Sequence, residues 1–121
     1  MTNTTTIIGR LTKDPELRTT SNGVSVVSFT IAVERNYKGS DGENITDFIP
    51  VIAWRKTAEI VSKYLSKGSL CSVTGALQTR NFVASDGSNR TIMEVNANHV
   101  HFLPSLKKAV RKEDPITNLP F

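Results

Sequence analysis

Residues 45–68 read ITDFIPVIAWRKTAEIVSKYLSKG, and this stretch predicts a strand followed directly by a helix. The strand is expected over residues 45–54, and both of its faces are apolar. One face carries Ile49, Val51 and Ala53, and the other carries Phe48, Pro50, Ile52 and Trp54. A core needs only one of these faces, so the other is expected to contact something else.

The helix is expected over residues 56–67. Ala58, Val61 and Leu65 recur at i, i+3 and i+7, which is typical of a helix that buries one face. Gly68 follows and supplies a stop signal.

Outward from this stretch, apolar residues alternate with turn signals, which is typical of an antiparallel β domain. Further strands are expected at 4–11, 24–34, 69–83 and 90–103, with an exposed glycine-rich loop at 36–44. The inward side chains are expected to be Val27, Phe29, Ile31, Val33, Val95, Ala97, Val100 and Phe102. The last four change phase, which predicts a β-bulge near Asn98, and Gly75 allows a sharp bend in the strand before it.

Together these elements predict an all-β fold, a five-stranded OB-fold barrel with one helix between strands three and four. A chain of 121 residues suits one such domain. We expect the domain to cover residues 1–104 and residues 105–121 to form a short flexible tail.

The chain has a formal net charge of +4 and a sequence pI of about 9.5, which permits an anionic partner. Part of that charge is concentrated in Lys107, Lys108, Arg111 and Lys112. This cluster fits either a solvated basic linker or a nucleic-acid site. The sequence contains neither an apolar run of membrane-spanning length nor a signal-peptide pattern, so we expect a cytoplasmic, nucleoid-associated protein with no membrane contact.

The sequence shows no recognisable set of catalytic residues, so an enzyme is not expected. Cys71 lies in an apolar run and is expected to be a buried strand residue. His99 and His101 share one face of a strand but have no third ligand nearby, so no metal site and no cofactor are expected.

Several aromatic residues have basic neighbours in the sequence. Tyr37 adjoins Arg35 and Lys38, Trp54 precedes Arg55 and Lys56, and Phe82 follows Arg80. Unpaired bases stack on flat rings while phosphates attract positive charge, so this pattern favours single-stranded DNA binding without sequence preference. Phe29, Phe102 and Tyr64 are interpreted as structural, and a one-residue change of register would instead bury Phe48 and Trp54.

A series of motifs resembles the bacterial single-stranded DNA-binding protein family across residues 1–103. They are GRLTKDPELR (9–18), VSVVSFTIAV (24–33), TDFIPVIAWRKTAEIV (46–61), YLSKGSL (64–70), VTGALQTRNF (73–82) and TIMEV (91–95). The resemblance implies that bases stack on Tyr37, Phe48, Trp54 and Phe82. It implies phosphate contacts at Arg35, Lys56, Lys67 and Arg80, with Arg10 and Arg55 as plausible additions.

The resemblance also implies a homotetramer that assembles through the first strand and coats single strands during replication, recombination, repair or DNA uptake. In this family an acidic tail ends in a Pro-Phe dipeptide that docks on other DNA-processing proteins. Here Leu119, Pro120 and Phe121 keep the apolar tip, but only Glu113 and Asp114 are acidic upstream. The tip is therefore either a docking motif or an incidental apolar terminus.

Two other classes of function remain open from the residues alone. The same barrel can bind oligosaccharides or proteins, although the pairing of rings with basic residues argues against this. A small hydrolase or nuclease is the other alternative, and it would degrade labelled single strands in the presence of magnesium.

Overall fold

The computed structural model describes residues 1–104 of the chain. The elements follow the order β1 (Thr5–Leu11), β2 (Glu16–Thr19), β3 (Ser25–Lys38), β4 (Asn44–Trp54), α1 (Arg55–Tyr64), β5 (Leu70–Val83) and β6 (Asn89–Leu103). The predicted tail, including Leu119, Pro120 and Phe121, lies outside the described residues.

Five of the strands close into a barrel. The sheet order is β1-β5-β6-β4-β3-β2, and an additional pairing between β1 and β3 completes the circle. All pairings are antiparallel except that of β4 with β6, where Val51 lies opposite Val95. The predicted five-stranded barrel, with its helix between the third and fourth barrel strands, is confirmed.

Strand β2 was not predicted from the sequence. It pairs with the first part of β3, and all four of its residues are exposed. A strand with no buried face leaves no alternation of apolar and polar residues to detect.

The core contains the inward side chains that alternation predicted for β3 and β4. Val27, Phe29 and Ile31 of β3 are buried, as are Val51 and Ala53 of β4. Helix α1 adds Ala58 and Val61 to this core cluster, and Leu65, which directly follows the helix, adds a third side chain. Burying these apolar side chains is the main force that closes the barrel.

Helix α1 is shorter than predicted, because it ends at Tyr64 and not at residue 67. Leu65 already has extended backbone angles, yet its side chain still reaches the core. Gly68 then adopts a positive φ of 87°, and its amide donates to the carbonyl of Leu11. The chain therefore leaves the helix early to reach the start of β5.

The register of β5 against β6 confirms the predicted bulge. Thr74 pairs with His99 and Gly75 pairs with Ala97, so Asn98 is the extra residue.

The prediction that Phe102 lies in the core is wrong, because its side chain is 58% exposed. Phe102 is the second-to-last residue of β6 and pairs with Cys71 of β5. Tyr64 is likewise exposed, at the last turn of α1.

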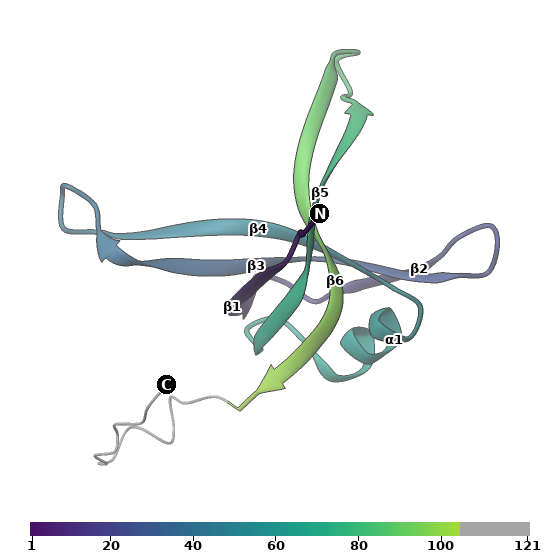
Figure 1. Ribbon diagram of the computed structural model, residues 1–121, viewed down its shortest axis with the longest axis horizontal. Helices are drawn as coiled ribbons and strands as arrows, with labels where there is room; N and C mark the ends of the chain where they lie inside the picture. Colours follow the sequence, from purple (N-terminus) through teal and green to yellow (C-terminus); the bar gives the residue numbers. More distant parts are fainter. Residues whose placement is uncertain (105–121) are drawn as a thin grey trace.

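Two long hairpins extend beyond the barrel in different directions (Figure 1). One is formed by the C-terminal half of β3 and the N-terminal half of β4. The other is formed by the C-terminal half of β5 and the N-terminal half of β6. We call them the β3–β4 arm and the β5–β6 arm.

Candidate nucleic-acid interface

All four aromatic residues predicted to stack on bases have exposed rings. Their exposed fractions are 58% for Tyr37, 64% for Phe48, 40% for Trp54 and 40% for Phe82. The alternative register that would bury Phe48 and Trp54 is wrong, because Val51 and Ala53 face the core in their place.

Three of these rings lie on two faces that meet at a groove, although none of the three lines the groove itself. Phe48, Pro50 and Trp54 alternate along the outward face of β4. Phe82 and Arg80 share one face of the β5–β6 arm, because they are two residues apart on β5. A groove of about 200 Å³ connects these two faces. Its walls include Ser28, Thr30 and Pro50 on one side and Arg80, Ile92 and Glu94 on the other.

Tyr37 lies apart from this groove, towards the end of the β3–β4 arm. The register of β3 against β4 shifts between Glu34 and Lys38, so Tyr37 falls within an irregular stretch. Arg35 contacts Asp47, which precedes Phe48 on β4 and therefore points to the opposite face of the arm. A single strand that touched all four rings would have to pass around this arm.

The side chain of Arg35 forms hydrogen bonds with two other side chains, those of Asp47 and Tyr37. Its Nε donates to Oδ2 of Asp47 at 2.9 Å, and its Nη2 donates to Oδ1 of the same carboxylate at 3.0 Å. Its Nη1 donates to the Tyr37 hydroxyl at 2.9 Å. These bonds, first that to Asp47 and then that to Tyr37, raise the pKa of Arg35, and the bond from Arg35 lowers the pKa of Asp47.

Arg80 is also paired with a carboxylate. Its Nε and Nη2 donate to the two carboxylate oxygens of Glu94 at 3.2 and 3.3 Å. Glu94 is only 7% exposed and is the buried charged residue of the described chain. The bond to Glu94 raises the pKa of Arg80. One wall of the groove therefore contains a compensated ion pair and not a free positive charge.

The other predicted basic residues are placed around the barrel. Arg10 donates from Nη1 to the carbonyl of Gly68 at 2.9 Å and lines a hollow beside Phe48. Arg55 and Lys56 follow Trp54 and line a second hollow. The Lys67 backbone amide donates to Asp14, which lines the groove beside Arg80 and Pro50. Within residues 1–104, no ion pair involves Arg10, Arg55, Lys56 or Lys67.

Arg55 has a strained backbone. Its φ is 57°, in the left-handed region that glycine favours, and among the described non-glycine residues it is the one with a positive φ. Trp54 just before it is extended, with φ −123° and ψ 154°. The chain therefore turns sharply at Arg55, the first residue of α1, directly after the exposed ring of Trp54.

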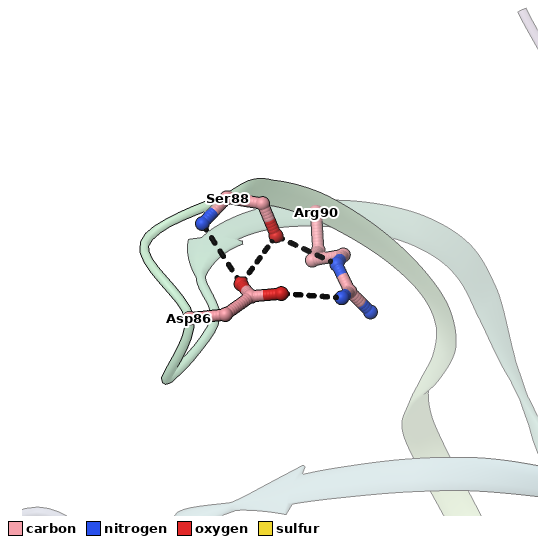
Figure 2. A network of polar contacts seen from close by, with 3 residues as sticks. All are labelled: Asp86, Ser88 and Arg90. Carbon is pink, nitrogen blue, oxygen red and sulfur yellow. Dashed lines mark hydrogen bonds and ion pairs between the residues drawn. The ribbon is translucent and has the colours of Figure 1, made fainter.

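The tip of the β5–β6 arm is fixed by a small polar network (Figure 2). The amide and the hydroxyl of Ser88 both donate to Asp86 Oδ1, at 2.9 and 2.6 Å. Arg90 donates from Nε to the Ser88 hydroxyl at 3.0 Å and from Nη2 to Asp86 Oδ2 at 3.3 Å. The bonds from the Ser88 side chain and amide lower the pKa of Asp86. The network rigidifies the turn that follows the Phe82 strand.

The family model described as "Single-strand binding protein family" matches residues 2–103. The chain belongs to this family. It is 52% identical over 103 residues to "Single-stranded DNA-binding protein 1" of Staphylococcus aureus strain MSSA476, covering 85% of this chain and 66% of that protein. It is 52% identical over 103 residues to "Single-stranded DNA-binding protein" of Caldanaerobacter subterraneus subsp. tengcongensis, covering 85% of this chain and 69% of that protein.

A third relative is "Single-stranded DNA-binding protein 3" of Listeria innocua serovar 6a. It is 50% identical over 105 residues, which cover 87% of this chain and 66% of that protein. The matched segment therefore spans slightly less than two thirds of the first Staphylococcus aureus relative and of the Listeria innocua relative.

For this member of the single-strand binding protein family, sequence reasoning missed two basic residues of the surface. Arg90 lies directly opposite Phe82 in the β5–β6 register, and Lys13 lines the groove beside Arg80. Arg90 could have been found only from the strand register, because eight positions separate it from Phe82 in the sequence. Lys13 lies in the turn before the unpredicted strand β2.

The remaining sequence features of this family member are the histidine pair, the single cysteine and the question of a membrane-crossing helix. The rings of His99 and His101 stack with their centres 6.3 Å apart, and residues 1–104 contain no group of three metal-binding side chains. Cys71 is buried as predicted, and burial raises the pKa of its thiol to about 11. In the same part of the chain, no helix has the length and apolar character needed to cross a membrane.

Proposed function

We propose that this protein binds single-stranded DNA without sequence preference, by stacking bases on exposed rings and neutralising phosphates with basic side chains. The observation that carries the proposal is the exposure of Phe48 and Trp54 on the outward face of β4 and of Phe82 on the β5–β6 arm, two faces that meet at one groove, with Tyr37 on the neighbouring arm. Four large rings that remain exposed in a folded protein need a reason, and stacked bases supply one. The names of the relatives agree with this ligand.

The phosphate contacts are proposed for the basic residues that surround the rings. Arg10 lies beside Phe48, and Arg55 and Lys56 follow Trp54. Lys67 adjoins the groove through Asp14. Arg35 and Arg80 complete the proposed set, but each of them already holds a carboxylate, so any phosphate would have to compete with that partner.

Coating of this kind needs no cofactor, and it would protect transient single strands during replication, recombination, repair or DNA uptake. The binding would be an equilibrium in which each neutralised phosphate adds about 0.7 to the salt slope. A protein in this role would act in the cytoplasm, at the nucleoid.

Titration with oligo-dT while tryptophan emission is recorded tests the proposal, because Trp54 is the only tryptophan in the sequence. We expect strong quenching by oligo-dT and much weaker quenching by a duplex of the same length. An equal response to the duplex would contradict the preference for single strands. Recovery of intact labelled oligo-dT after incubation with magnesium would separate binding from nuclease activity.

Assembly into a homotetramer through β1 is part of the proposal. Residues Thr5 to Arg10 of β1 pair with β5 along one edge, whereas the other edge meets β3 only at Arg10 and Leu11. The remaining edge offers backbone groups that a second copy could pair with. Native mass spectrometry should show four copies, and a monomer at micromolar concentration would contradict this part of the proposal.

The tip formed by Leu119, Pro120 and Phe121 is proposed to dock on another DNA-processing protein. Deletion of residues 115–121 should weaken binding to a recombination mediator or a primosomal helicase and leave the affinity for oligo-dT unchanged. Unchanged affinity for both protein partners would remove the tip from the proposal.

A further inference from the structure

The guanidinium of Arg35 uses all of its nitrogen atoms within the protein. Two of them bind the two oxygens of Asp47, and the third binds the hydroxyl of Tyr37. The resulting chain of bonds runs from β4 to β3 and then to the ring. An arginine fork suits this task because it is planar and can hold a carboxylate at two points while a further N–H remains available.

The ring at the end of this chain has little else to hold it. Tyr37 is 58% exposed, and the pairing of β3 with β4 is irregular on either side of it, between Glu34 and Lys38. An exposed side chain samples several rotamers, and a base can stack only on a ring that presents its face. A bond to the hydroxyl, at the far end of the ring, restricts this motion most.

We infer that Arg35 is a positioning residue, which aims the ring of Tyr37 for base stacking, and that Asp47 anchors it there. The inference rests on the proposed function. It reassigns Arg35, because a guanidinium whose charge is compensated by Asp47, and which already commits three of its five N–H groups within the protein, is a poorer phosphate ligand than an unpaired one.

The hydrogen bond from Arg35 also leaves the hydroxyl proton of Tyr37 available as a donor. Because the Tyr37 oxygen accepts a hydrogen bond from Arg35, its own proton is free to be donated outward. A base edge or a phosphate oxygen next to the ring would be a suitable acceptor. Tyr37 would then hold a nucleotide by its face and by its hydroxyl.

Three variants test the inference: Tyr37→Phe, Arg35→Lys and the combination of both. Their affinity for labelled oligo-dT is measured by fluorescence anisotropy at several salt concentrations. Tyr37→Phe keeps the ring and removes the acceptor, whereas Arg35→Lys keeps the positive charge and removes the fork. We expect each single variant to weaken binding about threefold to tenfold, with an unchanged salt slope.

The affinity of the double variant for oligo-dT should equal that of whichever single variant binds less tightly, since both changes break the same chain of hydrogen bonds. Lys56→Gln is the matched control, and it should lower the salt slope by about 0.7. All variants should unfold at the wild-type temperature, because the side chains of Arg35 and Asp47 are exposed on the arm, away from the core.

Full affinity in Arg35→Lys would overturn the inference, because charge alone would then suffice. Losses that multiply in the double variant would also overturn it. These outcomes differ from failure of the proposed function, which would appear as wild-type protein that does not bind oligo-dT at all.

Discussion

Gly75 of β5 packs directly against the backbone of Asn96 on β6. A methyl group at Gly75 would overlap the carbonyl oxygen of Asn96 and the Cα of Ala97. This contact lies at the bulge of Asn98, where β5 and β6 change register as they leave the barrel. The bend that separates the barrel from the β5–β6 arm thus depends on a residue without a side chain.

Gly75→Ala should therefore destabilise the fold by about 1–3 kcal/mol, as overpacking against fixed backbone does. Urea denaturation followed by circular dichroism measures the loss. Gly39→Ala is the matched control, because its methyl group would meet chiefly side-chain atoms of Asp41 and Ile45 at 3.3 Å or more. Equal stability of both variants would show that the two strands can move apart freely.

Trp54→Ala should weaken binding of oligo-dT by about 1–3 kcal/mol, which is the contribution of one stacked base. Fluorescence anisotropy of a labelled oligonucleotide measures the affinity without relying on the removed tryptophan. Tyr64→Ala is the control, since Tyr64 is an exposed ring at the far end of α1. A similar loss in both variants would show that the effect is not specific to Trp54.

Arg55→Gly should raise stability by about 1 kcal/mol at most, because glycine removes the cost of a positive φ but gains freedom in the unfolded chain. The same change should weaken DNA binding and reduce the salt slope by about 0.7, since one phosphate contact is lost. Thermal unfolding and salt-dependent titrations provide the two measurements. A variant that is both less stable and unchanged in its salt slope would contradict both expectations.

Substitution of the two partners in the groove should have unequal effects. Arg80→Ala leaves the carboxylate of Glu94 buried without its partner, so we expect a loss of about 1–3 kcal/mol in stability. Glu94→Gln keeps an oxygen that can accept a hydrogen bond from the half-exposed Arg80, so the loss should be smaller, and binding of oligo-dT should strengthen as the negative charge disappears. Urea denaturation ranks the two variants, and the reverse order would contradict this reading of the pair.

Cys71 should react with a thiol reagent only when the protein unfolds. At pH 8, a thiol with a pKa of about 11 has about one thiolate in a thousand molecules, and the side chain is fully buried. The raised pKa also affects stability. Between about pH 9 and pH 11 the folded state keeps the proton that the unfolded state loses, so stability should fall as pH rises through that range.

Replacing Cys71 with Ser tests the assignment of this pH effect, because the part of the slope that the thiol causes should disappear. Rapid labelling of the native wild-type protein at pH 8 would contradict the burial of the side chain.

The sequence was sufficient to predict the barrel because the core strands follow a simple period of two. Val27, Phe29 and Ile31 alternate with polar neighbours, and burial of one face then fixes the register. The bulge at Asn98 was visible for the same reason, as a break in that period. Phe102 was misplaced because alternation gives the side of a strand but not where the core ends along it.

The candidate surface was predicted less completely. The rings could be found because Trp54 and Phe82 have basic neighbours a few positions away. The carboxylate partners could not, because Asp47 lies 12 positions from Arg35 and Glu94 lies 14 positions from Arg80. Those contacts depend on strand register and on the rotamers of long side chains, which local sequence does not determine.

Because the two arms project beyond the barrel, the length of the proposed DNA path can change without a change in the stability of the fold. Tyr37 and Phe82 lie on hairpins that project beyond the closed barrel, whereas the buried side chains lie where the barrel strands and α1 meet. Lengthening either hairpin by a pair of residues would shift these rings outward without disturbing a single core contact. The number of nucleotides covered by each copy can thus diverge among relatives that keep the same interior.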